Sequence, residues 1–279
     1  MKLQETNCYS CNSSEYQPYD WENGYNLVKC RHCGLLYVNP RPPEDSINNS
    51  ARTGIHQGEK EINVTNSFNP NKIPRYLKIL KDFYDAEYLS NKCWLDIGCG
   101  NGEFLIALKE FSKDKVRVKG SEPNKFKIET ARKHDLDVEF LDLEKHDKQY
   151  DFVSSLDVFS HLPNPVETLK TWKGLIKNDG EFFIETGHSC HLPSKYHNKP
   201  YSLPDHLSFA NKDILVQILD KTGYQIVKVE IYRGIFYREA NLTNFSKELV
   251  KKLLGRKNTF HSFFPKYRHG DMFIRAKNK

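Results

Sequence analysis

The chain lacks any hydrophobic run long enough to cross a membrane. Its longest apolar stretches span only a handful of residues, whereas a membrane-spanning helix needs about 18 to 20. The first residues, MKLQETNCYSCNSSE, also lack the charged and apolar segments of a secretory signal. These two absences predict a cytoplasmic protein without a membrane span. A length of 279 residues, 38% of them hydrophobic, suits one large domain with an appendage.

Two common phosphate-binding motifs are also missing, although one turn is rich in glycine. In CWLDIGCGNGEFLIALKEF, a short apolar strand, a tight turn and a helix are predicted to follow one another. A dinucleotide fingerprint beginning at Gly98 would need glycine where Glu103 stands, which counts against a dehydrogenase. The lysine of an ATPase loop is absent as well. The stretch therefore predicts the start of a βαβ nucleotide-binding unit of another class.

The cysteines are odd in number, and four of the seven form two pairs. Cys8 and Cys11 are separated by two residues, as are Cys30 and Cys33, and 18 residues lie between the pairs. This spacing is typical of a tetrahedral zinc site, whereas disulfides are rare in a reducing compartment. Between the pairs, residues 23–24 read Asn-Gly and predict a hairpin turn. Four thiolates leave no open coordination position, so we expect a structural zinc ribbon.

Positive charge is concentrated towards the C-terminus. Residues 233–279 contain 12 basic and 3 acidic residues, whereas the rest of the chain carries a small excess of acid. An anionic partner such as a nucleotide, a phosphate, a nucleic acid or an acidic lipid would fit this asymmetry, and so would a solvated basic face. NFSKELVKKLLGR has the spacing of a short amphipathic helix. The loop TFHSFFPKYRHG could stack on a base or sugar, or cover a sheet edge.

The segment LDIGCGNG resembles motif I of the class I S-adenosylmethionine-dependent methyltransferases. The similarity continues in order through VRVKGSEP, VEFLDLEK, YDFVSSLDVFSHLPNP, GLIKNDGEFFIETG and LPDHLSFANKDILVQILDKTGYQIVKVEIY, and GDMFIRAKN resembles the last, antiparallel strand. The resemblance implies an α/β fold, in which a seven-stranded Rossmann-like methyltransferase sheet accompanies the small N-terminal zinc ribbon. The implied layout is a ribbon at 1–45, a linker or lid at 46–72 and a methyltransferase domain at 73–279 with a basic insertion at 233–270.

This resemblance also assigns a site for S-adenosylmethionine. Asp96 would accept hydrogen bonds from the cofactor ammonium, and Glu122 would bind both ribose hydroxyls. Asp142 would bind the adenine amino group, although Asp147 and Asp151 lie close to it in sequence. The glycines would let the backbone approach the cofactor where a Cβ would collide. The full implied set is Asp96, Gly98, Cys99, Gly100, Gly102, Glu122, Pro123, Asp142, Leu143 and Leu156.

The ribbon and the segment CRHCGLLYVNPRP are similar to a bacterial group of methyltransferases that act on sugars and other small molecules. The deoxysugar C-methyltransferases of that group have a further C-terminal nucleotide-binding domain, which is missing here, so O-methylation is favoured. The resemblance places a catalytic histidine at His206, with Asp205 to orient it, and His161 is a further candidate. The implied acceptor is a small molecule, an anionic nucleotide-linked sugar, in surface-polysaccharide or natural-product synthesis.

Two other functions fit the same motifs. The 23S rRNA guanine methyltransferases also pair a zinc ribbon with this fold, so an RNA base is an alternative acceptor. However, the fourth strand reads SSLDVFSHL and lacks the Asn/Asp-Pro-Pro motif of enzymes that alkylate exocyclic amines. No Pro-Cys dipeptide follows the fourth or fifth strand, which counts against pyrimidine C5 chemistry. The third interpretation is a non-catalytic module that binds zinc and a nucleotide.

Overall fold

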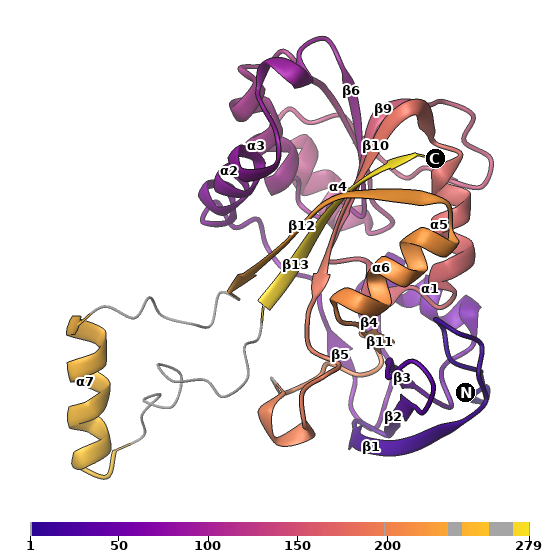
Figure 1. The fold of residues 1–279 in the computed structure, drawn as a ribbon, viewed down its shortest axis with the longest axis vertical. Helices are drawn as coiled ribbons and strands as arrows, with labels where there is room; N and C mark the ends of the chain where they lie inside the picture. Colours follow the sequence, from indigo (N-terminus) through magenta and orange to yellow (C-terminus); the bar gives the residue numbers. More distant parts are fainter. Residues whose placement is uncertain (1, 198, 234–241, 257–269, 279) are drawn as a thin grey trace.

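The computed structural model describes residues 2–278 except residue 198 and the segments 234–241 and 257–269 (Figure 1). Its centre is a seven-stranded sheet in which β13 runs antiparallel to both neighbours and the other strands pair in parallel. The strand order confirms the predicted methyltransferase sheet and its antiparallel last strand. From edge to edge the strands are β12 (Tyr224–Arg233), β13 (Gly270–Asn278), β10 (Ile176–Gly187), β9 (Tyr150–Leu156), β6 (Cys93–Ile97), β7 (Arg117–Ser121) and β8 (Val138–Glu139).

Helices cover both faces of this sheet (Figure 1). One face packs on α2 (Lys72–Phe83), α3 (Glu103–Ser112) and α4 (Lys125–Arg132). The other face packs on α5 (Pro165–Lys173) and α6 (Lys212–Lys221). The central strands β6 and β9 are buried along nearly their whole length, because helices cover both faces of the sheet. Since parallel strands end at one edge, the loops that follow β6, β7, β9 and β10 meet at the same side of the molecule.

A second, four-stranded sheet contains the cysteine pairs. Its strands are β1 (Tyr16–Glu22), β2 (Tyr25–Cys30), β3 (Leu36–Val38) and β11 (Ser208–Phe209). The predicted hairpin turn is confirmed: Asn23 and Gly24 both have positive φ, 53° and 86°, as a two-residue hairpin requires. The fourth strand, β11, comes from the part of the chain that forms the larger sheet, and it pairs antiparallel with β3. The two sheets also share one cluster of buried apolar side chains, so the ribbon is packed directly on the domain.

The segment predicted as a linker or lid contains secondary structure. It includes most of α1 (Glu44–Thr53) and the two-stranded pair β4 (Ile55–His56) and β5 (Ile62–Asn63). The rest crosses the glycine turn: the Asn101 side chain donates to Asn66, and the Glu103 carboxylate accepts the Asn69 N–H at 2.8 Å. Composition pointed to a connector because Asn, Pro, Ser and Gly dominate it, but these two contacts hold it over the start of α3.

The remaining elements lie outside the two sheets. Short 3₁₀ helices are η1 (Glu87–Leu89), η2 (Phe159–His161) and η3 (Ser194–Tyr196). The predicted basic amphipathic helix is present as α7 (Leu242–Leu253). The predicted aromatic loop TFHSFFPKYRHG lies outside the described residues except for its last glycine. Among the helices of the described ranges, none is both long enough and apolar enough to cross a membrane.

Candidate cofactor and acceptor site

The protein's own side chains pack closely against two of the three glycines in the turn between β6 and α3. A Cβ at Gly98 would lie 2.4 Å from the Val158 side chain, and one at Gly102 would lie 2.2 Å from Leu136. The protein's own packing therefore already requires glycine at these two positions, and their contact with the cofactor stays a prediction. At Gly100, by contrast, φ is 57° and a Cβ would meet nothing within 4 Å. Open space lies over Gly100.

Glu122 follows β7 and points back at this turn. Its carboxylate oxygens accept the backbone N–H groups of Gly100 and Asn124, each at 2.9 Å. The residue is only 4% exposed, and burial raises the pKa of its carboxyl group despite those two donors. Each oxygen retains a lone pair, so the group can still accept two hydroxyl hydrogen bonds. Pro123, the next residue in the predicted set, is partly buried beside it.

Asp96 lies near the end of β6, buried to 2% exposure. The Ser154 hydroxyl donates to it at 2.6 Å, and the Trp94 indole N–H in turn donates to Ser154 at 2.8 Å. Burial raises the pKa of Asp96 to about 7, with the nearby Glu122 charge acting in the same direction. Such a carboxyl group becomes a stable anion only when a cation approaches it, which suits a site for an ammonium group.

The other predicted cofactor residues fall into two groups. Cys99 and Leu156 are buried at the ends of β6 and β9, and burial raises the pKa of the Cys99 thiol well above its usual range. Asp142 and Leu143 lie beyond the end of β8. Asp142 is exposed and pairs with Lys145 at 2.9 Å, whereas Leu143 packs partly buried on the core. The adenine contact of Asp142 stays a prediction.

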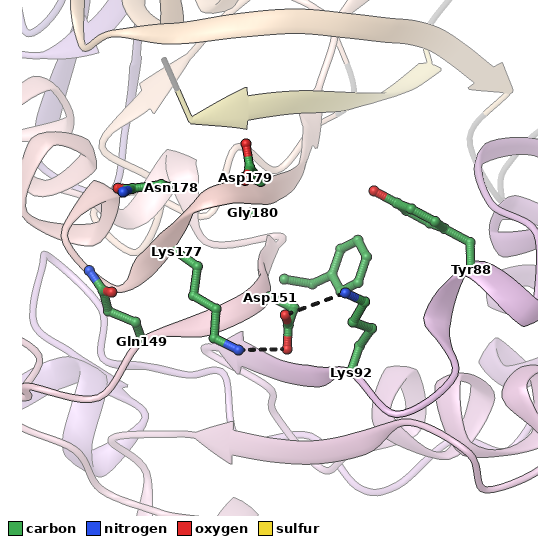
Figure 2. Close-up of a pocket in the computed structure, with 9 residues that line it drawn as sticks. Tyr88, Lys92, Gln149, Asp151, Lys177, Asn178, Asp179 and Gly180 are labelled. Atoms are coloured by element: carbon green, nitrogen blue, oxygen red, sulfur yellow. Dashed lines mark ion pairs between the residues drawn. The ribbon is translucent and has the colours of Figure 1, made fainter.

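Two cavities differ in their relation to this site. One, of about 380 Å³, lies between connector residues 65–68, Asn101 of the glycine turn and Phe126 of α4. Neither Asn101 nor Phe126 was in the predicted site set: Asn101 stands within LDIGCGNG, whereas Phe126 lies outside the motifs. The other cavity, of about 460 Å³, lies at the amino ends of the parallel strands, where Lys92 and Lys177 pair with Asp151 (Figure 2). None of the predicted site residues lines that second cavity.

The predicted catalytic residues come together, but with different partners from those expected. Asp205 does not hydrogen-bond its neighbour His206. Instead its carboxylate lies 3.0 Å from His161 Nδ1 and 3.1 Å from His56 Nε2. The side chains of the adjacent residues Asp205 and His206 point apart. His56, which contacts the Asp205 carboxylate together with His161, belongs to β4 and precedes Asp205 by 149 positions. His56 was missed because nothing around it in the connector suggests a site.

His206 is oriented by a backbone carbonyl. Its Nδ1 lies 2.8 Å from the Tyr201 carbonyl oxygen, which can only accept, so Nδ1 carries the proton and Nε2 carries the lone pair. Its ring centre is 4.8 Å from that of His161. Burial and the neighbouring His161 lower the pKa of His206. Burial opposes the charging of His161, but the Asp205 carboxylate outweighs it and raises the pKa of His161.

The four paired cysteines converge as predicted. The Sγ atoms of Cys8 and Cys33 are 3.4 Å apart, those of Cys11 and Cys30 are 3.5 Å apart, and all four lie within 4.8 Å of one another. A zinc ion with Zn–S bonds of about 2.3 Å would separate its thiolates by about 3.8 Å. The donor set and its dimensions therefore fit a tetrahedral metal site.

Comparison with known proteins covers mainly the larger domain. Residues 71–229 match the family described as Methyltransferase domain. A tRNA U34 carboxymethyltransferase of Campylobacter jejuni is 30% identical over 117 residues, 39% of this chain and 39% of that protein. A ubiquinone biosynthesis O-methyltransferase of Yersinia enterocolitica is 24% identical over 138 residues, 46% of this chain and 53% of that protein. The chain thus spans about half or less of the length of these curated relatives.

Solved structures show the same fold. Phosphoethanolamine N-methyltransferase 2 of Haemonchus contortus, in complex with S-adenosylhomocysteine, has a TM-score of 0.54 at 19% identity and covers 74% of this chain and 52% of its own. Coclaurine N-methyltransferase, also bound to S-adenosylhomocysteine, has a TM-score of 0.52 at 14% identity and covers 77% and 75%. The family match spans more than half of the residues. The chain therefore belongs to the methyltransferase-domain family and has the fold of the S-adenosylmethionine-dependent methyltransferases.

Proposed function

We propose that the protein methylates a hydroxyl group of a small molecule in the cytoplasm, with a nucleotide-linked sugar as the acceptor. The observation that carries this proposal is the orientation of His206, which lies among the loops that follow the parallel strands. Its Nδ1 proton is held by the Tyr201 carbonyl, its lowered pKa favours the neutral ring, and its Nε2 keeps a lone pair. Hydroxyl methylation needs such a group, because the acceptor must lose a proton as the methyl group arrives.

The cofactor pocket supports the same chemistry. When bound, S-adenosylmethionine supplies an electrophilic methyl group on a positively charged sulfur. Glu122 would accept the two ribose hydroxyls, and Asp96 would accept the ammonium group, each on lone pairs that the protein leaves available. The open space over Gly100 leaves room for the cofactor to approach the backbone. These residues bind and align the donor, and alignment supplies much of the rate of such a displacement.

The histidine cluster provides the base. With the cofactor bound, the acceptor oxygen would displace its sulfur at the methyl carbon, and the acceptor proton would pass to His206 Nε2. The Tyr201 carbonyl keeps the His206 proton on Nδ1, so Nε2 is the nitrogen that can receive a proton. Asp205 favours the charged form of His161, and that positive charge keeps His206 neutral. Asp205 also faces His206, where its charge acts in the opposite direction and favours the protonated ring.

We further propose that Cys8, Cys11, Cys30 and Cys33 hold one structural zinc ion. Four sulfur donors favour zinc, and their mutual distances match its thiolate geometry. All four positions would be filled by the protein, so the metal would stabilise the ribbon and take no part in methyl transfer.

Substitution of His206 tests the proposed reaction. His206→Ala should lower kcat by about 10²- to 10⁴-fold, and S-adenosylmethionine affinity measured by calorimetry should be unchanged. The native rate should rise with pH through the apparent pKa of a histidine, and the variant should lose that limb. His146→Ala is a matched control, because His146 hydrogen-bonds Tyr150 and belongs to neither the predicted cofactor set nor the histidine cluster. A His206→Ala enzyme within a few-fold of native turnover would make His206 structural and His161 the next candidate.

Transfer to RNA is the alternative that a specific observation favours. The similarity to a tRNA-modifying enzyme and the excess of basic residues at 233–279 both point to it. An RNA acceptor predicts binding that weakens steeply with salt, because phosphate contacts release counterions. Salt-independent turnover of a nucleotide-linked sugar would exclude RNA as the main acceptor. Cofactor binding without turnover on either class would instead indicate a non-catalytic module.

A further inference from the structure

We propose that the cysteine-bearing sheet holds the loop that carries His206, and that Glu22 of β1 is a positioning residue for His206. The inference rests on the proposed function of His206 as the base. It concerns a pair of carboxylates, on Asp20 and Glu22, at the end of β1 that faces the loop between β10 and β11. Nothing in their local sequence marks them as functional.

Glu22 holds the chain that orients the base. One carboxylate oxygen accepts the Tyr201 N–H at 2.7 Å, and the other accepts the Leu203 N–H at 3.1 Å. Tyr201 and Leu203 are buried, with 2% and 0% exposure. A buried N–H that loses its partner costs about 1–3 kcal/mol, so neither amide can leave Glu22 freely. Because the carbonyl of Tyr201 accepts the His206 Nδ1 proton, Glu22 acts on the base through a single residue.

Asp20 fixes the same loop through its side chains. Its Oδ2 accepts the Ser194 and Tyr201 hydroxyls, each at 2.6 Å, and lies 2.7 Å from Lys199 Nζ. Burial would raise the pKa of Asp20, but Lys199 and the two hydroxyls hold it well below its usual range. Asp20 therefore stays ionised and holds Ser194, Lys199 and Tyr201 of the loop against β1.

The ribbon also anchors the chain that follows His206. The Val38 N–H donates to the Leu207 carbonyl at 2.9 Å, and β11 begins at the next residue and pairs with β3. From the other direction, the Leu207 N–H donates to the Ser160 carbonyl at 2.7 Å, beside His161. His206 is thus held between two attachments to the ribbon, Glu22 before it and β3 after it.

This arrangement couples the position of the ribbon to the protonation of the base. The charged groups that face His206 are Asp205 on its own loop, His161 of η2 and Asp157 after β9. The Tyr201 carbonyl stabilises the protonated His206 ring, as Asp205 and Asp157 do. If Glu22 no longer holds Tyr201, that carbonyl shifts, His206 loses part of this stabilisation, and its pKa falls. A purely structural role for Glu22 would leave the pKa of His206 unchanged.

The test substitutes Glu22 by glutamine. Glu22→Gln keeps one acceptor oxygen but turns an NH₂ donor towards a buried N–H, at nearly constant volume. We expect kcat to fall by about tenfold or more with little change in S-adenosylmethionine affinity. We also expect the lower limb of the pH–rate profile to move to lower pH, by about 0.5 unit. Glu22→Asp, which retains both acceptor oxygens, should recover part of the rate. Glu15→Gln is the matched control, because Glu15 precedes β1 and its side chain is exposed.

Nuclear magnetic resonance titration of the His206 ring provides a readout without substrate. A lower His206 pKa in Glu22→Gln, and not in Glu15→Gln, supports the proposal even if no tested sugar is methylated, in which case only the proposed function fails. An unchanged His206 pKa with native kcat overturns the proposal. If Glu22→Gln does not fold, the His206 ring is titrated in Asp20→Asn instead, because that substitution weakens the contacts of Asp20 with the same loop. An unchanged pKa in that variant also overturns the proposal.

Discussion

Replacement of Asp96 by asparagine should make the protein more stable and less able to bind its cofactor. Asp96 is almost fully buried, and its pKa is raised to about 7, from an ordinary value of 3.8. Asparagine has nearly the same shape and keeps the oxygen that accepts from Ser154. It carries no charge to desolvate, so the substitution removes the cost of burial without creating a cavity.

The sign of the effect follows from proton linkage. Between pH 4 and 7 the unfolded chain has lost the Asp96 proton while the folded protein keeps it, so the folded state is progressively disfavoured as pH rises. At 1.36 kcal/mol per pH unit, the full penalty above pH 7 is about 4 kcal/mol. Asp96→Asn should recover most of it at pH 8. The difference in free energy of unfolding between Asp96→Asn and the native protein should be about 2 kcal/mol larger at pH 8 than at pH 5.5.

Urea unfolding at both pH values measures this difference. Subtracting the native curve from the variant curve cancels the titration of all other groups. Asp151→Asn is the matched control, because Asp151 lies near the start of β9 and pairs with Lys92 and Lys177 (Figure 2), whereas Asp96 lies near the end of β6. Burial would raise the pKa of Asp151, but the Cys93 N–H and Lys177 lower it. That substitution should therefore destabilise the protein at pH 8, by about 1–2 kcal/mol.

Two outcomes would refute this reasoning. If Asp96→Asn is no more stable than the native protein at pH 8, the buried carboxyl group does not carry the cost assigned to it. If the gain is the same at pH 5.5 and pH 8, it arises from packing or hydrogen bonding and not from ionisation. Calorimetry should show in either case whether the variant still binds S-adenosylmethionine.

Two further predictions concern the cofactor and the metal. Glu122→Ala should weaken S-adenosylmethionine binding by about 1.5–3 kcal/mol, because it removes the charged acceptor for the ribose and frees the Gly100 N–H; unchanged affinity by calorimetry would remove Glu122 from the site. Metal analysis should find one zinc ion per native chain and none in Cys30→Ser, whose ribbon should be destabilised while cofactor binding is unchanged. A native preparation that is fully active without metal would contradict the zinc assignment.

Features set by neighbours in sequence could be predicted without the structure. The glycine turn is one, because Gly98 and Gly102 must adopt positive φ between a strand and a helix. The hairpin at residues 23–24 is another. The position of Glu122 also follows from sequence order, since the residue after the second parallel strand must lie beside the turn after the first. The turn and the hairpin needed only local conformation, whereas the role of Glu122 also rested on the resemblance to the class I methyltransferases.

Features set by distant contacts could not be predicted. The partner of Asp205 is a case in point: His161 and His56 both reach its carboxylate, and they come from a loop after β9 and from the connector. The proximity of Asp205 to His206 in sequence suggested a direct pair, but consecutive side chains point in different directions. Glu22 was missed for a similar reason, because its acceptor role depends on two amides about 180 residues away.

The pairing of β11 with β3 has a consequence for the order in which the protein folds. During synthesis the four cysteines and the hairpin emerge before β11, so β3 must wait about 170 residues for the strand that covers its edge, or about 10–30 s at typical elongation rates. An uncovered strand edge can pair with other chains. The ribbon expressed alone should therefore associate through β3. A hybrid protein with the ribbon of a relative would have to exchange residues 208–209 together with the first forty.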